Sequence, residues 1–325
     1  MPEPLRRSWL LIPGSRSDLI EQSWTLEADV IIFDLEDLVH DTRKSEARAA
    51  IRNGLSQARK GGAEVFVRCD LELLYADLDA AVWPELTGIV LPKVIAVEQV
   101  SEAEAVLDRL EAERGVRRAG LVGEVNEADE PRTVENALEI HLALENAQGN
   151  HNALTLLQSS PRVRSVSLGR ADLVMDLHPE PQGELHLLPH LMQRLVVVAN
   201  TAGVVPIGAW WQANSRGLRA TAEATLTSAR LGRMAGFKGA ICRDPEQVRA
   251  LNEGFTPSAD EVQEARALVQ ALAEARSQGR AYANVDGLLV DATLARAAQS
   301  IVELADACTA RDLSKSAAVD RARVA

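Results

Sequence analysis

Short apolar runs alternate with longer amphipathic stretches along most of this chain. The first four runs cover residues 9–12, 30–33, 64–70 and 88–94, and residues 44–60 between two of them carry a helical pattern. Runs rich in Val, Ile and Leu are typical of parallel strands that are buried on both faces. Strands that alternate with helices predict repeated βαβ units and a parallel sheet.

Three further runs extend the pattern into the second half of the chain, at residues 163–169, 204–207 and 236–242. Together with the first four and a fifth strand, they make eight. Eight parallel strands with intervening helices are the elements of a TIM (β/α)8 barrel, which takes about 250 residues. We therefore expect an α/β barrel domain over residues 1–256.

Two segments compete for the fifth strand. One covers residues 119–124 and ends at Glu124, and the other covers residues 138–145 and ends at Glu145. We prefer the second, because a Gly-Asn break and a helical pattern follow it. On this choice the earlier segment belongs to an extra turn or short insertion.

The chain continues well beyond the eighth strand. A helix starts at Ser258, an extended piece covers residues 283–291, and a second helix follows to about residue 304. This part is too small for a free domain, so we expect residues 257–310 to form a helical lid on the barrel or on a neighbouring copy. Residues 311–325 are polar and rich in Ala, which predicts a flexible tail.

The composition narrows the class of function. The formal net charge of −12 argues against nucleic acid as a partner, since phosphate binding needs a basic face. No apolar run reaches the roughly 18 residues that a membrane span needs, and no secretory signal opens the chain. We therefore expect a cytoplasmic protein with no membrane partner. Three widely spaced cysteines argue against a disulfide framework and against a clustered zinc site.

Acidic residues follow the second strand directly. Asp34, Glu36 and Asp37 come after the apolar run at residues 30–33. Burying carboxylates without partners is costly, so these side chains should lie where the strand emerges from the core. In α/β enzymes the carboxyl ends of the strands form the active site. The position of the three acids therefore predicts an enzyme. Glu36 and Asp37 lie furthest along the strand, so we expect these two to contact the catalytic site.

Two more acids end successive strands in the preferred assignment. Glu145 and Asp172 would open at the same mouth of the barrel and could share one hard cation, which predicts a magnesium site. The alternative is that each acid only caps the helix that follows it. The spacing favours neither interpretation over the other.

Basic residues in the first third of the chain are candidates for anion binding. Arg68 ends the third strand and is suited to a substrate carboxylate, although it could also only pair with the acids of the second strand. Lys93 after the fourth strand has the same two roles open to it. Arg16, after the first strand, is a further candidate for binding an anionic ligand or cofactor group.

Eight short motifs follow one another between about residues 6 and 305. They are Arg7-Ser8-Trp9-Leu10-Leu11-Ile12-Pro13-Gly14, Asp34-Leu35-Glu36-Asp37, Lys44 with Ala47-Arg48, Val67-Arg68, Leu91-Pro92-Lys93-Val94, Glu145 with Gly149, Leu168-Gly169 with Asp172, and Gly236-Phe237 with Pro257-Ser258. In this order they resemble the citrate lyase β-subunit-like proteins, a group within the HpcH/HpaI-type aldolases that includes malyl-CoA and citramalyl-CoA lyases.

The resemblance implies a TIM barrel with a C-terminal lid in a homo-oligomer, a trimer or a hexamer. It implies carbon–carbon cleavage or formation next to a CoA thioester. By the same resemblance Glu145 and Asp172 bind Mg²⁺, and Arg68 binds the carboxylate of a 2-oxo acid. Asp291, in the lid, would act as acid or base in the site of a neighbouring subunit.

The chain departs from the family pattern on one side of the mouth. Gly208 follows the seventh strand where an Asp is usual, and two tryptophans come shortly after it. Asp244 stands where the family has a His before Pro, and Asp70 replaces an Asn. These departures affect the predicted CoA specificity more than the predicted cleavage chemistry.

We therefore expect a magnesium-dependent lyase that acts on a short β-hydroxyacyl-CoA such as malyl-CoA or citramalyl-CoA. One alternative is a class II pyruvate-type aldolase that acts on free oxo acids. Its usual base is a His after the strand-two Glu, whereas here Asp37 follows and His40 is a poor positional match. The other alternative is a catalytically altered citrate lyase β-like subunit or binding protein.

Overall fold

Eight parallel strands form one sheet in the computed structural model, which describes residues 4–117, 137–177, 184–211 and 220–324. Their order is β7-β6-β5-β4-β3-β2-β1-β8. The strands are β1 Ser8–Pro13, β2 Val30–Asp34, β3 Glu64–Arg68, β4 Gly88–Pro92, β5 Glu139–Leu144, β6 Val163–Leu168, β7 Val205–Ile207 and β8 Ala240–Cys242. All eight occur where the apolar runs predict them.

The two outer strands of this order also meet. The amide of Gly208 donates to the carbonyl of Gly239 over 2.6 Å, and the amide of Lys238 donates to the carbonyl of Pro206 over 3.0 Å. These bonds join the end of β7 to the approach of β8, so the sheet closes on itself. The TIM barrel prediction is confirmed. Strand β5 ends just before Glu145, as preferred, whereas Glu124 lies outside the described residues.

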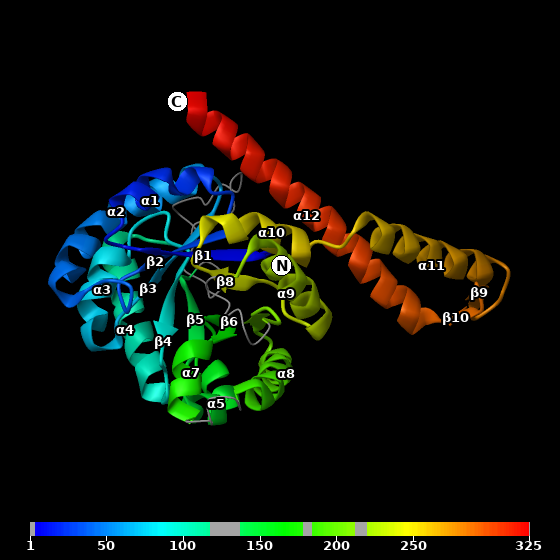
Figure 1. Cartoon of the computed structure of the whole chain (residues 1–325), viewed down its shortest axis with the longest axis horizontal. Helices are drawn as coiled ribbons and strands as arrows, with labels where there is room; N and C mark the ends of the chain where they lie inside the picture. The colour runs from blue at the N-terminus through cyan, green and yellow to red at the C-terminus, as the bar shows by residue number, and fades with distance from the viewer. Residues whose placement is uncertain (1–3, 118–136, 178–183, 212–219, 325) are drawn as a thin grey trace.

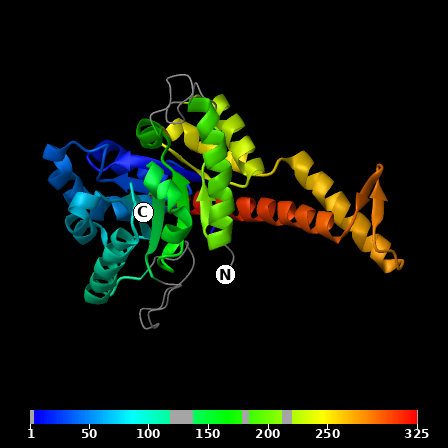
Figure 2. The same ribbon diagram turned by 90° about the horizontal axis from the view of Figure 1, so that it is seen from below.

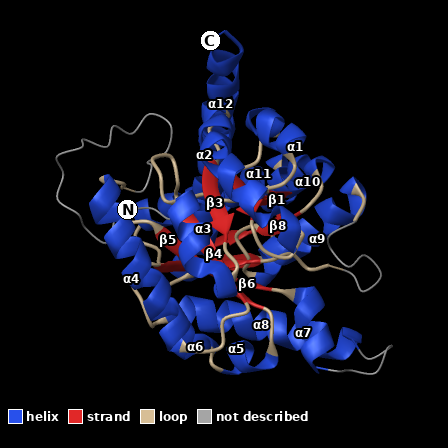
Figure 3. Ribbon diagram, turned by 90° about the vertical axis from the view of Figure 1, so that its left-hand side faces the viewer, coloured by secondary structure: helices blue, strands red, loops and turns tan. Residues whose placement is uncertain are grey.

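Helices surround the strands (Figures 1 and 3). The predicted helix over residues 44–60 is confirmed. Around the barrel lie α1 Ser17–Gln22, α2 Lys44–Lys60, α3 Leu74–Ala81, α4 Val97–Arg114, α5 Ala147–His151, α6 Ala153–Leu157, α7 Arg170–Leu177, α8 Glu184–Ala202, α9 Ala222–Ala235 and α10 Pro245–Phe255. Among the described residues, no helix is long and apolar enough to cross a bilayer.

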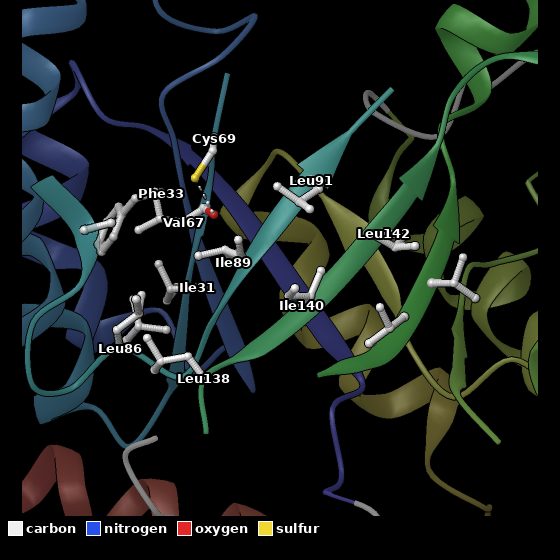
Figure 4. Packing of buried hydrophobic residues seen from close by; sticks show 14 of the residues in the cluster. Ile31, Phe33, Val67, Cys69, Leu86, Ile89, Leu91, Leu138, Ile140 and Leu142 are labelled. Atoms are coloured by element: carbon white, nitrogen blue, oxygen red, sulfur yellow. Dashed lines mark hydrogen bonds between the residues drawn. The ribbon is translucent and has the colours of Figure 1, made fainter. Parts of the chain in front are cut away.

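Side chains of successive strand residues point alternately to two cores. Ile31, Val67 and Ile89 belong to the larger cluster, which lies between the strands and the helices (Figure 4). Trp9 and Ile32 belong to a smaller cluster that fills the barrel interior. Continuous apolar runs were needed because both faces of each strand are buried.

The N-terminal end of the barrel interior is polar. The Arg6 guanidinium, which is almost fully buried, forms ion pairs with Glu64 and Glu139. Next to them, His141 lies 2.8 Å from the Ser165 hydroxyl. Burial, with the nearby positive charge of Arg6, lowers the pKa of His141 to about 3, so the ring is neutral at physiological pH. Each of these side chains has at least one polar partner, although Glu64 Oε1 lies buried without one.

The C-terminal part forms an arm that stands away from the barrel (Figures 1 and 2). It consists of α11 Ala259–Ser277, β9 Ala283–Val285, β10 Leu288–Val290 and the first part of α12 Ala292–Val324. Ser258 caps α11, as predicted, and accepts a hydrogen bond from the amide of Glu261. Leu268, Leu272 and Val290 belong to a separate small core within the arm. Within one copy, this arm does not cover the barrel mouth.

The flexible tail expected at residues 311–325 is wrong for residues 311–324, which continue α12. This part of the helix returns to the barrel and packs over the turn before β3, where a Cβ on Gly62 would lie 3.3 Å from that of Ala318. The reason is a buried charge cluster at the N-terminal end of the barrel, which we call the Asp29 clamp. It consists of Arg7, Asp29, Arg311, Asp312 and Lys315.

The Asp29 clamp centres on a fully buried carboxylate. Asp29 Oδ2 accepts from Arg7 Nε over 2.9 Å, and Asp29 Oδ1 accepts from Lys315 Nζ over 2.6 Å. Arg311 donates to the main-chain carbonyl of Asp29 over 2.9 Å. Burial alone would raise the pKa of the Asp29 carboxyl, but the charges of Lys315, Arg7 and Arg311 outweigh it and hold that pKa well below its usual value.

Removing this carboxylate should weaken the protein in a pH-dependent way. Because the pKa of Asp29 is depressed in the folded state, its carboxylate stabilises the fold at pH values above the pKa of Asp in the unfolded chain, about 3.9. This stabilisation is lost as the pH falls below that value. We expect Asp29→Asn to cost about 3–5 kcal/mol at pH 7, because three buried cations lose their partner. The difference from wild type should narrow by about 1.4 kcal/mol per pH unit below pH 4.

Urea unfolding of both proteins between pH 2 and pH 7 measures this difference. Asp320→Asn serves as control, because Asp320 forms only an exposed pair with Arg323. That change should shift the unfolding free energy by less than about 0.5 kcal/mol at any pH. A constant difference between Asp29→Asn and wild type across the series would contradict the expectation.

Candidate active site

The carboxyl ends of β2, β3, β4 and β5 are neighbours in the sheet and place charged side chains at one mouth. Asp34 and Arg68 are register partners at the ends of β2 and β3. Lys93 follows β4, and Glu145 follows β5. The structure thus brings together side chains from four consecutive strands, because parallel strands all end at the same edge.

Arg68 is held from below by Asp34. Its Nε and Nη2 donate to the two oxygens of Asp34 over 2.6 and 2.9 Å. Asp34 is fully buried and also accepts from the amides of Glu36 and Leu38. The third nitrogen of the fork, Nη1, lies 3.2 Å from Glu36 Oε2. One carboxylate therefore fixes both the guanidinium and the loop after β2.

Lys93 is bound by the other two acids of that loop. Its Nζ donates to Glu36 over 2.5 Å and to Asp37 over 3.0 Å. Lys93 has φ of 56°, a conformation that is uncommon outside Gly and often found at functional sites. Burial opposes its charge, but the hydrogen bonds that it donates to Glu36 and Asp37 raise its pKa. Lys93 is thus a permanent cation.

The two acids that hold Lys93 differ in their environment. Burial raises the pKa of Glu36, although the charge of Arg68 and the hydrogen bond from Lys93 work against it. For Asp37, burial is outweighed by the hydrogen bond from Lys93, and the pKa is lowered. Asp37 is half exposed at the rim, whereas Glu36 lies between the two cations.

Glu145 is buried with one oxygen unsatisfied. Its Oε2 is inaccessible to solvent and has no hydrogen-bond partner among the described residues. Burial raises the pKa of Glu145 to about 8, the charge of Arg68 opposes this, and the negative charges of Glu36 and Asp172 add to it. A buried carboxylate oxygen without a donor, next to a second carboxylate, is an arrangement that a cation would complete.

Gly169 makes room for Glu145. A Cβ at position 169 would lie 2.0 Å from Cγ of Glu145 and 2.6 Å from its Oε1, so only Gly can follow β6 here. Asp172 lies three residues later, in the first turn of α7, with its side chain exposed. The negative charge of Asp172 adds to the raised pKa of Glu145, so the two carboxylates lie within electrostatic reach of each other. Their assignment as metal ligands stays a prediction.

Filling this space should displace Glu145. We expect Gly169→Ala to weaken Mg²⁺ binding at least about tenfold, because the carboxylate must move by more than an ångström to avoid the new methyl group. Calorimetric titration with Mg²⁺ measures the effect. Gly115→Ala is the control: it forces a side chain into φ of 63° at the end of α4, with no atom within 4 Å of its Cβ. The control should lose about 1 kcal/mol of stability and no Mg²⁺ affinity.

Two predicted site residues lie outside this cluster. Arg16 precedes α1 and pairs with its exposed neighbour Asp18 over 2.7 Å. Asp291 directly follows β10, and β10 lies at the far end of the arm in Figure 1. There its Oδ1 accepts from the amides of Thr293 and Leu294 and caps α12. Within one copy, neither side chain meets Glu145.

The departures on the other side of the mouth have local explanations. Asp244 accepts a hydrogen bond from the amide of Glu246 and caps α10. Trp211 packs against the outer hydrophobic cluster, so it is a core residue. Asp70 forms an ion pair with Lys44 at the start of α2. Asp244 and Asp70 are therefore both satisfied within the chain.

Sequence reasoning missed two residues that shape the site. Asn146 donates from its Nδ2 to the carbonyl of Lys93 over 3.2 Å and accepts from the amide of Gly149 over 2.6 Å. It thereby holds the strained turn at Lys93. Gly169 is the second. Local sequence does not reveal its role, because that role depends on the side chain of Glu145, which follows another strand. The spacing Asn-x-x-Gly after Glu145 is a signal that could have indicated the first.

Comparison with known proteins agrees with this geometry. Residues 7–245 match the family described as HpcH/HpaI aldolase/citrate lyase. The chain belongs to this family. It is 26% identical to the citrate lyase subunit beta of Leuconostoc mesenteroides subsp. cremoris, over 94% of this chain and 95% of that protein. It is 29% identical to an L-malyl-CoA/beta-methylmalyl-CoA lyase of Cereibacter sphaeroides, over 95% of this chain and 97% of that protein.

The chain is also 30% identical to a (3S)-malyl-CoA thioesterase of Cereibacter sphaeroides, over 88% of this chain and 89% of that protein. Among solved structures, the chain is similar to protein CitE from Mycobacterium tuberculosis in complex with magnesium, acetoacetate and coenzyme A. That match has a TM-score of 0.66 at 20% identity and covers 93% of this chain and 98% of the other. It supports the fold. The resemblance seen in the sequence motifs is confirmed, and so is the assignment to carbon–carbon lyases.

Proposed function

We propose that the chain is a magnesium-dependent lyase that cleaves or forms a short β-hydroxyacyl-CoA, such as malyl-CoA or citramalyl-CoA. The observation that carries the proposal is the buried, unsatisfied oxygen of Glu145 beside Asp172 and within the field of Arg68. A cation site next to a fixed guanidinium suits a 2-oxo acid. The cation would bind its keto oxygen, and the guanidinium would bind its carboxylate. Relatives named as malyl-CoA lyases support the substrate class.

The residues present fit a magnesium ion. Glu145 and Asp172 supply the hard oxygen ligands that Mg²⁺ prefers, and Mg²⁺ usually keeps several waters, so two carboxylates suffice. Gly169 leaves the space in which Glu145 lies. When bound, the ion would polarise the keto oxygen of the oxo acid. CoA is expected as part of the substrate, with Arg16 and Lys93 as the proposed contacts for its anionic groups.

Arg68 is proposed to bind the substrate carboxylate through Nη1, which lies 3.2 Å from Glu36 Oε2 and would share that contact with the substrate. Its other two nitrogens already serve Asp34, so the guanidinium cannot rotate. The residue is only 11% exposed, and a preorganised donor of this kind needs no reorganisation when the substrate binds. Glu36 and Asp37 would hold Arg68 and Lys93 in place and balance their charge.

Cleavage requires two proton movements. The β-hydroxyl of the substrate loses its proton, the bond between its carbon and the α-carbon of the thioester breaks, and the released enolate takes up a proton at the α-carbon. We propose Asp291 as the acid or base. Since it follows β10, which lies at the end of the arm and away from the mouth of the same barrel, it would come from a neighbouring copy. The protein would then be a homo-oligomer, a trimer or a hexamer.

Product analysis tests this function. Purified protein with Mg²⁺ is given malyl-CoA, citramalyl-CoA and β-methylmalyl-CoA, and acyl-CoA and oxo acid are measured together. The proposal requires that both appear in equal amounts. Free CoA with the intact hydroxy acid would instead indicate a thioesterase, the activity named for one relative. Turnover of free oxo acids without CoA would indicate the aldolase alternative, and no turnover of any substrate would favour a non-catalytic subunit.

A further inference from the structure

Helix α12 connects two places that lie far apart. Asp291 caps its first turn, and Lys315 in the Asp29 clamp lies 24 positions later. At 1.5 Å per residue this distance is about 36 Å. The helix contains neither Gly nor Pro, so nothing in its sequence favours a kink. It runs as one continuous helix from the arm to the barrel (Figure 1).

The barrel end of this helix is fixed by buried charges. Lys315 Nζ donates to Asp29 Oδ1 over 2.6 Å and to the main-chain carbonyl of Glu27 over 2.8 Å. Its side chain is 4% exposed. Arg7 reaches Asp312 one turn earlier along α12. These contacts hold the helix at two successive turns, which sets its direction as well as its position.

The other helix of the arm is tied to the barrel more loosely. Arg233 on α9 donates to both oxygens of Glu261 in the first turn of α11, over 2.6 and 2.9 Å. Glu261 is 40% exposed, so this pair is weaker than those of the Asp29 clamp. The direction of the arm therefore depends mainly on the buried end of α12.

We propose that the Asp29 clamp positions the active site of a neighbouring copy by setting the direction of α12. The inference rests on the proposed function, in which Asp291 acts in the neighbour's mouth. Over about 36 Å, a tilt of roughly 2° displaces Asp291 by about 1 Å, and a misplacement of that size can cost about a hundredfold in rate. Lys315 is a positioning residue that lies at the opposite end of the barrel from the reacting atoms.

Lys315→Met is the variant of choice. It removes the ammonium group that reaches both Asp29 and Glu27, while Arg7 and Arg311 still neutralise Asp29, so the fold should persist. If contacts with the neighbour's mouth placed Asp291 instead, this variant would lose stability and little activity. A role in positioning Asp291 and a role in stability alone can be told apart by placing Lys315→Met in only one of the two kinds of chain in a mixed oligomer.

The experiment co-expresses two inactive chains with different tags and purifies oligomers that contain both. Glu145→Gln disables the mouth of one chain, which still supplies its own Asp291. Asp291→Asn disables the arm of the other chain, which still supplies its mouth. Sites that combine the intact mouth with the intact arm should regain activity, about one third of the wild-type sites in a head-to-tail trimer. The readout is kcat and KM with Mg²⁺ and malyl-CoA.

Lys315→Met is then added to one chain at a time. In the Glu145→Gln chain, which supplies the arm, we expect kcat of the regained activity to fall at least fivefold with KM within twofold. In the Asp291→Asn chain, which supplies the mouth, we expect Lys315→Met to change kcat of the regained activity by less than twofold. Lys315→Arg in the arm-supplying chain should keep most of the activity. Arg323→Met in the arm-supplying chain removes an exposed charge on the same helix and should leave kcat and KM unchanged.

Equal losses in both chains, or no loss in either, would overturn the positioning role while leaving the proposed function intact. If no activity were regained before Lys315 was changed, Asp291 would not act from a neighbouring copy, and the inference would fall. The lyase assay on the wild-type protein decides separately whether the proposed reaction occurs.

Discussion

Glu145→Gln is expected to abolish Mg²⁺ binding and to lower kcat/KM by about a thousandfold or more, roughly 4 kcal/mol of transition-state stabilisation. The amide has the shape of the carboxyl group but cannot become an anion. Because burial already raises the pKa of Glu145 to about 8, the protein without metal holds a largely protonated group here at neutral pH. Glutamine therefore replaces one neutral side chain with another, and the fold should be as stable as before.

Calorimetry with Mg²⁺, steady-state kinetics and thermal unfolding measure the three effects together. Glu98→Gln, at an exposed position on α4, is the matched control and should leave all three unchanged. A Glu145→Gln protein that bound Mg²⁺ as tightly as wild type would refute the ligand assignment. A protein that lost stability and metal binding together would indicate a structural role for the carboxylate.

Arg68→Met is expected to remove activity and to destabilise the protein by about 3–5 kcal/mol, because it strips a buried carboxylate of its partner. Asp34 is fully buried and would keep only the amides of Glu36 and Leu38 as donors. Arg68→Lys should lose less stability, yet most of the activity, since an ammonium group cannot bind two oxygens side by side.

Folding and catalysis can be separated with a double variant. Arg68→Met combined with Asp34→Asn removes both charges, so the unfolding free energy should recover by more than half while kcat/KM stays low. Chemical denaturation and kinetics of the two single variants and the double variant complete the cycle. Recovery of activity in the double variant would exclude Arg68 as the group that binds the substrate carboxylate.

The barrel could be predicted from the sequence because each strand is buried on both faces. The run Val30–Asp34 is apolar until its last residue, and that residue marks the mouth. The grouping of Arg68, Lys93 and Glu145 followed from the same rule, since parallel strands end together. Local pattern and tertiary position agree at these residues.

Contacts between distant segments could not be predicted. The polar, Ala-rich sequence around Lys315 predicts a flexible tail, but its partner Asp29 lies 286 positions earlier and gives no local signal. The need for Gly169 arises from a side chain on another strand. The turn at Lys93 depends on Asn146, more than fifty residues later. In each case the residue is determined by its neighbours in space, which the local pattern does not record.

The Asp29 clamp also affects the order in which the chain can fold during synthesis. Arg7 and Asp29 are synthesised well before the C-terminal part of α12 and can neutralise each other first. Arg311 and Lys315 emerge almost three hundred residues later and complete the charge cluster. Until then, the Asp29 carboxylate lacks two of the three cations that surround it in the folded protein. The last helix thus completes the folding of the first strands.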